Sequence, residues 1–215
     1  KVAIRFAMCF PDVYEIGMSH LGIQILYDMF NRREDVWCER VYSPWVDLDK
    51  VMREEHIPLF ALESQDPIKD FDFLCITLGY EMCYTNILSA LDLAGIELLA
   101  SNRKSGPFVI CGGPCACNPE PLAPFVDAFA MGDGEELTLK TIEVYRKWRD
   151  AGLPREKYLE MLAQLDGIYV PSLYDIAYKE DGTIANIQPH APAKMPVMKA
   201  LVNDLTAADY PDTLV

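Results

Sequence analysis

Positive charge is scarce in this 215-residue chain, which carries 19 Lys and Arg against 33 Asp and Glu and a formal net charge of −14. Such a chain repels the phosphate backbone of nucleic acid, so we expect no nucleic-acid partner. An anionic membrane surface is disfavoured for the same reason. No apolar run is long enough to span a bilayer, and Arg5 interrupts the only N-terminal run that could resemble a signal segment. We therefore expect a cytoplasmic protein with no membrane partner.

Histidine is also rare, with three residues, and no Ser-His-Asp or Cys-His arrangement has supporting context. The seven cysteines are an odd number, which favours free thiols, several of them buried as small apolar groups. Cys111, Cys115 and Cys117 are the closest approach to a ligand set, because three thiolates could bind an iron–sulfur centre with an open site. Apolar packing and loop thiols explain them more simply, and we predict no metal site in this chain.

Short apolar runs alternate with segments of helical periodicity along most of the chain. This alternation predicts right-handed βαβ units and an α/β fold, namely a Rossmann-like or flavodoxin-like doubly wound, mainly parallel sheet with helices on both faces. The runs that predict strands are 2–8, 36–42, 59–62, 73–78, 108–111 and 127–131. Helices are expected over 18–29, where Ser19 is a plausible N-cap, and over 47–55, 85–94, 137–148 and 154–163.

The C-terminal part of the chain has a different pattern. Residues 173–178 and 184–188 flank Asp181-Gly182 and predict a β-hairpin with a tight turn. Beyond it, prolines and irregular periodicity predict an extended tail. We divide the chain into a Rossmann-like domain (1–165), a hairpin extension (166–192) and a linker towards a further domain (193–215). That division predicts an exposed apolar face, which would include Pro196, Val197, Met198, Leu201, Val202 and Leu205.

Glycine follows three of the four most informative strand candidates, at the edge where ligands bind to doubly wound sheets. Each glycine alone is explained by a short turn, but their occurrence after successive strands favours a ligand site. None of these segments matches the GxGxxG or GxxxxGK[ST] phosphate loops, which disfavours nucleotide binding by those mechanisms. The predicted cofactor-binding residues are Asp12, Tyr14, Gly17, Met18, Ser19, Thr77, Gly79, Tyr80, Glu81, Gly112, Gly113, Pro114, Gly132 and Gly134.

Residues 12–17 read Asp-x-Tyr-x-x-Gly and resemble the D-x-H-x-x-G loop of cobalamin-binding domains. Residues 10–30 and the GGP, NPEP and GDGEE segments within 111–136 resemble the N-terminal domain of cobalamin-dependent radical SAM proteins, more narrowly a bacterial subfamily of uncharacterised function. Residues 167–174 and 202–213 also resemble that subfamily. The resemblance implies a cobalamin cofactor and a C-terminal radical SAM domain in the same polypeptide.

In such proteins a CxxxCxxC motif holds the [4Fe-4S] cluster that cleaves S-adenosylmethionine. The 215 residues contain no such motif, so this chain is not expected to be catalytic alone. In the parent enzyme the resemblance implies radical chemistry, which could include methyl transfer through cobalt, and it does not imply a substrate.

Tyr14 stands where the related loop has the histidine that can ligate cobalt. A phenol must lose a proton of pKa near ~10 to become a good ligand, so the resemblance implies a corrin without a protein nitrogen on cobalt. A structural or interaction domain that has lost the cofactor is the alternative, and a flavodoxin-like domain that holds FMN is a weaker one. Gly17→Leu and Gly113→Leu separate the first two, since they change either corrin affinity or only stability.

Overall fold

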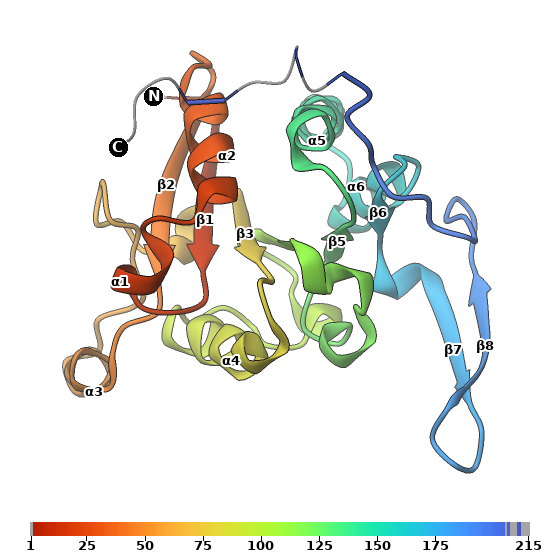
Figure 1. The fold of residues 1–215 in the computed structure, drawn as a ribbon, viewed down its shortest axis with the longest axis horizontal. Helices are drawn as coiled ribbons and strands as arrows, with labels where there is room; N and C mark the ends of the chain where they lie inside the picture. Colours follow the sequence, from red (N-terminus) through yellow and green to blue (C-terminus); the bar gives the residue numbers. More distant parts are fainter. Residues whose placement is uncertain (1, 205, 207–209, 212–215) are drawn as a thin grey trace.

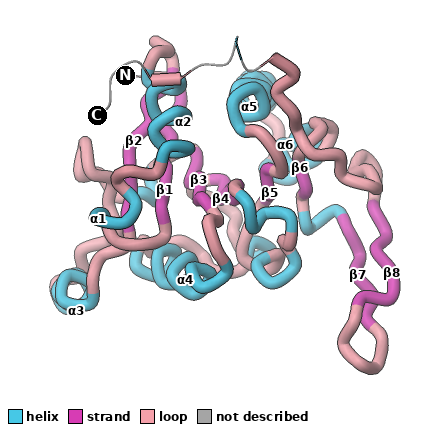
Figure 2. Tube along the Cα trace, viewed as in Figure 1, coloured by secondary structure: helices cyan, strands magenta, loops and turns pink. Residues whose placement is uncertain are grey.

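The computed structural model describes residues 2–204, 206 and 210–211 of the chain. Six strands form one sheet in the order β2-β1-β3-β4-β5-β6 (Figure 2). Neighbours among the first five are parallel, whereas β6 pairs antiparallel with β5. The strands are β1 (Ile4–Phe10), β2 (Val36–Tyr42), β3 (Phe73–Thr77), β4 (Phe108–Gly112), β5 (Ala128–Ala130) and β6 (Ile168–Tyr169). The predicted doubly wound, mainly parallel sheet is confirmed.

Helices cover both faces of this sheet. The longer ones are α2 (Leu21–Asn31), α3 (Val46–Glu54), α4 (Tyr84–Leu93), α5 (Gly134–Asp150) and α6 (Arg155–Leu162), and α1 (Tyr14–Gly17) is a single turn. Short 3-10 turns are Ile68–Asp70, Glu81–Cys83, Ala100–Asn102, Pro114–Cys117, Glu120–Leu122 and Pro171–Leu173. Helices α2, α5 and α6 share one apolar core with β1, while α3 and α4 pack in the other.

The central strand β1 shows how the sequence divides its side chains between these cores. Ile4, Phe6 and Met8 face α2 and α5, whereas Ala7 and Cys9 face the α4 side, as the two-residue period of a strand requires. The Phe6 ring stacks between Phe30 and Phe73, with centroid distances of 4.5 and 4.4 Å. A strand buried on both faces must be apolar at nearly every position, which explains why β1 is apolar everywhere except at Arg5.

A hairpin and a tail follow the sheet. Strands β7 (Tyr174–Tyr178) and β8 (Ile184–Pro189) pair antiparallel and project from the body of the molecule (Figure 1). The tail returns to the end of β5, where Ala200 N donates to the Met131 carbonyl (2.9 Å) and Asp133 N donates to the Ala200 carbonyl (3.0 Å). A further bond joins Val202 N to the Asp133 carboxylate (2.8 Å). The predicted hairpin and extended tail are therefore present.

The apolar face predicted for the tail is exposed in part. Pro196, Met198 and Leu201 are exposed, and Val197 and Val202 are half-buried. Leu205 lies outside the described residues. The division of the chain into 1–165, 166–192 and 193–215 stays a prediction, although the two residues of β6 belong to the main sheet.

Three local expectations were wrong. Residues 59–62 form no strand, only an isolated bridge between Phe60 and Pro67. The short antiparallel β6 was missed, because two residues show no periodicity. His20 replaces Ser19 as the N-cap of α2, with its Nδ1 accepting a bond from Ile23 N. In the described part of the chain, no helix has the length and apolar character needed to cross a membrane.

Charged groups are buried at the amino ends of β4 and β5. The Oδ2 atom of Asp127 accepts bonds from Arg103 (2.8 Å), Arg155 (2.9 Å) and the backbone N of Val109 (2.7 Å). The side chains of Asp127 and Arg103 are only 2% and 1% exposed. This cluster joins the start of α6 to the two strands.

We expect Asp127→Ala to lower the free energy of unfolding by about 3–5 kcal/mol, because it leaves buried guanidinium groups without their carboxylate. Urea denaturation measures this loss. The control is Glu180→Ala in the exposed hairpin turn, for which a change within about 0.5 kcal/mol is expected. A loss below about 1 kcal/mol for Asp127→Ala would contradict this account of the cluster.

Candidate functional site

The strand order reverses between β1 and β3. From β1 the chain crosses to β2 on one side, and from β3 it crosses to β4 on the other. The two connections leave the sheet in opposite directions, so a crevice opens beyond the carboxyl ends of these strands. This is the edge at which the sequence places its candidate residues.

A pocket of about 390 Å³ lies at this edge between α2 and α5. That volume lies within the range of small-molecule sites. Its lining is mainly apolar, with Met8, Ile23, Leu26 and Ile110 among the side chains and the Thr77 hydroxyl as a polar group. Six of the predicted site residues line the pocket, namely Thr77, Gly112, Gly113, Pro114, Gly132 and Gly134.

Gly112 and Gly134 leave open room in this pocket. A Cβ atom on Gly112 would come no closer than 3.6 Å to the Ala130 carbonyl, and one on Gly134 no closer than 3.6 Å to a Leu26 methyl. Both are ordinary van der Waals distances, and neither glycine has a positive φ. The chain itself therefore does not require glycine there, and the missing side chains enlarge the pocket.

Gly113 and Gly132 have a structural reason to be glycine, since each has a φ of +100°. A Cβ atom on Gly113 would meet the Leu78 backbone at 3.0 Å, and one on Gly132 would collide with the Ala200 backbone. The tail thus occupies the space beside Gly132 that the sequence assigned to a ligand.

Asp12 links the loops that follow β1 and β3. Its Oδ1 accepts a bond from Val13 N (2.8 Å), and its Oδ2 accepts one from the Tyr80 hydroxyl (2.5 Å). The hydrogen bond to Asp12, followed by burial and the carboxylate charge, raises the pKa of Tyr80 to about 12. Tyr80 therefore stays protonated at neutral pH and holds the two loops together.

Tyr14 lies on the single-turn helix α1 and is exposed, with its ring edge-on to Tyr42 at 5.2 Å. Met18 and Ser19 follow it and are also exposed. The predicted residues that do not line the pocket between α2 and α5 are Asp12, Tyr14, Gly17, Met18, Ser19, Gly79, Tyr80 and Glu81. Their role in cofactor binding stays a prediction.

Neither the apolar lining of the pocket nor His20 is among the site residues predicted from the sequence. His20 lines the pocket, and burial lowers the pKa of its imidazole, which suits a neutral ring that accepts a backbone N–H. The alternation of Ile4, Phe6 and Met8 along β1 was the available signal for the lining, because it places Met8 on the same face as α2.

The cysteines do not form a metal site among the described residues, where no three His, Cys, Asp or Glu side chains are arranged to hold a metal ion. Cys111 is fully buried, and burial raises the pKa of its thiol well above the usual value. Cys115 is half-buried and Cys117 is exposed. The three thiols thus differ in their environments: Cys111 packs in the core, whereas Cys115 and Cys117 lie in the turn that follows β4.

Comparison with known proteins identifies the family. Residues 22–171, well over half of the chain, match the model of the N-terminal region of radical SAM proteins. The chain belongs to this family of radical SAM N-terminal domains. The matched segment runs from α2 through β6, and so includes both helices that border the pocket.

This radical SAM N-terminal domain is 27% identical over 191 residues to the uncharacterised protein MJ0966 of Methanocaldococcus jannaschii. The match covers 83% of this chain but 37% of that protein, so the chain spans little more than a third of its curated relative. Among solved structures it is similar to the radical S-adenosylmethionine methyltransferase TsrM from Kitasatospora setae, which has cobalamin and a [4Fe-4S] cluster bound. That match has a TM-score of 0.49 and 11% identity, and covers the whole chain and 32% of TsrM.

Substitution of Gly17 tests whether this predicted site residue must be glycine for the stability of the domain. A Cβ atom there would lie 2.6–2.7 Å from the rings of Tyr42 and Phe10. We therefore expect Gly17→Leu to lower the free energy of unfolding by about 1–3 kcal/mol through overpacking, as measured by urea denaturation. Gly79→Leu is the control, because nothing lies within 4 Å of its Cβ position. Equal stability of the two variants would show that Gly17 is not constrained by packing.

Proposed function

We propose that this domain binds cobalamin and presents it to a radical SAM domain elsewhere in the same polypeptide. The observation that carries the proposal is the apolar pocket between α2 and α5 at the reversal of strand order. Membership in the radical SAM N-terminal family supports the partner domain, whose [4Fe-4S] cluster and S-adenosylmethionine belong to the proposal for the intact protein.

The pocket suits the nucleotide tail of cobalamin, which ends in a flat, largely apolar heteroaromatic base. Met8, Leu26 and Ile110 offer apolar contacts, and the Thr77 hydroxyl can hydrogen-bond to a polar atom of the tail. Gly112 and Gly134 supply room for the base. The loops after β1 and β3, which Asp12 and Tyr80 join, would then hold the corrin ring.

Cobalamin supplies a cobalt centre that can carry a methyl group, and this chain's part is to bind and orient it. Tyr14 occupies the loop position of a cobalt-ligating histidine, but its phenol is a poor ligand at neutral pH. The exposed Tyr14 ring serves instead as packing or as a hydrogen-bond donor to the corrin. Methyl transfer and radical chemistry on a substrate are the activities that we propose for the whole protein.

The second candidate is a structural domain of the same fold that shapes its partner without a cofactor. The contact of the tail with Gly132 favours it, because the chain's own backbone fills space that a ligand would otherwise use. On this alternative the pocket between α2 and α5 would bind no part of cobalamin.

Titration of the 215-residue chain with hydroxocobalamin separates the two candidates. We expect a change in the visible spectrum with saturable heat of binding, and about tenfold weaker affinity for Gly134→Leu, whose side chain fills the pocket. Leucine is a better helix former than glycine, so this variant should remain folded. Ala151→Leu, at the exposed end of α5, is the matched control and should bind as the unaltered chain does.

An unchanged spectrum with no heat of binding would overturn the cobalamin proposal and favour the structural candidate. Equal affinities of the Gly134→Leu and unaltered chains for hydroxocobalamin would show that the nucleotide tail of cobalamin does not enter this pocket. Flavin absorbance in the purified protein would instead revive the FMN alternative.

A further inference from the structure

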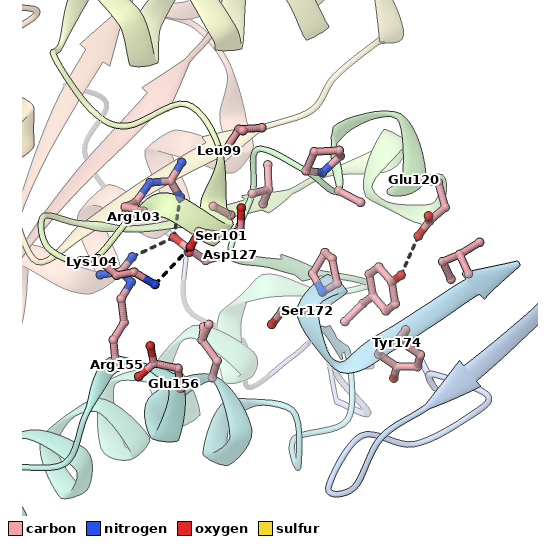
Figure 3. Close-up of a pocket in the computed structure, with 18 residues that line it drawn as sticks. Leu99, Ser101, Arg103, Lys104, Glu120, Asp127, Arg155, Glu156, Ser172 and Tyr174 are labelled. Carbon is pink, nitrogen blue, oxygen red and sulfur yellow. Dashed lines mark hydrogen bonds and ion pairs between the residues drawn. The ribbon is translucent and has the colours of Figure 1, made fainter.

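A second pocket, of about 450 Å³, lies at the amino ends of β4 and β5, at the opposite edge of the sheet from the pocket between α2 and α5 (Figure 3). Loop residues before β4, the start of α6 and the turn that precedes β7 form its walls. Neither the family match nor the cobalamin proposal assigns this pocket a role.

One end of this pocket is rich in positive charge. Arg103 and Arg155 both bind the same oxygen of Asp127, so two buried or half-buried guanidinium groups share one carboxylate. By contrast, Arg5 binds two carboxylates of its own, those of Glu39 and Asp66. One carboxylate can neutralise only one of the two guanidinium charges. A net positive charge therefore remains in a buried place where solvent screens it poorly.

The geometry of Arg155 keeps this charge in place. Its Nη atoms donate to the carbonyls of Gly106 (3.0 Å) and Pro107 (2.9 Å), and its guanidinium lies 3.9 Å from the centroid of the Phe108 ring. Burial lowers the pKa of Arg155, an effect that Asp127 opposes and the charge of Arg103 reinforces. An anion in the pocket would relieve that repulsion.

Lys104 adds a third cation at the same end, and its Nζ donates to the Ser101 carbonyl at 3.2 Å. The carboxylates at this end are Asp127 and the exposed Glu156. Three positive charges therefore face two negative ones, in a chain whose overall charge is −14. The other carboxylate of the pocket, Glu120, lies at the far end in Figure 3 and accepts a bond from Tyr169 (2.6 Å).

The rest of the pocket is largely apolar. Leu159, Pro171 and Tyr174 line it, and Ser172 adds a hydroxyl between the two ends. A ligand that filled both parts would place its charge near Lys104 and its carbon skeleton against these walls. Burial of that skeleton would supply affinity that an exposed charge alone does not.

From this arrangement we propose that the pocket binds a small organic anion, a carboxylate or phosphate group carried on an apolar or aromatic body. Lys104 and Arg155 hold the anionic group, and Leu159, Pro171 and Tyr174 enclose the body. This site is separate from the proposed cobalamin pocket. A ligand can therefore bind to either site whether or not the other is occupied, and either proposal can be wrong without the other.

Isothermal titration of the 215-residue chain with phenyl phosphate, phenylacetate, benzyl alcohol and inorganic phosphate tests the proposal. We expect one saturable site for phenyl phosphate or phenylacetate, weakened by added NaCl, and weaker or no binding of the other two. Lys104→Met should weaken this binding about fivefold, as for loss of one partly exposed charged contact. Ser172→Trp should abolish it by filling the apolar part.

Lys140→Met, which removes an exposed lysine of α5, is the matched control and should leave binding unchanged. Both pocket variants should bind hydroxocobalamin as the unaltered chain does, which distinguishes failure of this site from failure of the cofactor proposal. No saturable binding of either aromatic anion would overturn the inference. So would equal affinities of the Lys104→Met and Lys140→Met variants, or equal binding of benzyl alcohol.

Discussion

The reversal of strand order between β1 and β3 is the constraint on which the candidate cofactor site depends. The connections from β1 to β2 and from β3 to β4 leave in opposite directions and pack their helices on opposite faces of the sheet, so a crevice opens between the two strand ends. Helices α2 and α5 flank that opening on one face. Apolar packing around Phe6 holds the central strands in register and thereby fixes where the crevice lies.

The sequence predicted the doubly wound sheet because short, mainly apolar runs, typical of strands buried on both faces, alternate with segments of helical periodicity. It also placed Thr77, Gly112 and Gly134 correctly at one edge, since parallel strands end together. It could not reveal why Gly132 is glycine, because Ala200 approaches it from a distant part of the chain. The cation-rich pocket was equally hidden, because Arg103, Asp127 and Arg155 meet only in the folded state.

The two edges of the sheet carry different chemistry. The carboxyl edge has an apolar pocket with few charges, which favours a flat, neutral group. The amino edge has two guanidinium groups that share the carboxylate of Asp127, beside the pocket that we propose binds an anion. The antiparallel strand β6 contributes to this difference, because its carboxyl end brings Tyr169 and Pro171 to the amino edge of the sheet.

The hydrogen bonds of Ala200 have a mechanical consequence. They attach the tail to Met131 and Asp133, which lie between the end of β5 and the first turn of α5. A displacement of the tail at Ala200 would therefore also displace Met131 and Asp133. These two residues flank Gly132, which lines the pocket between α2 and α5.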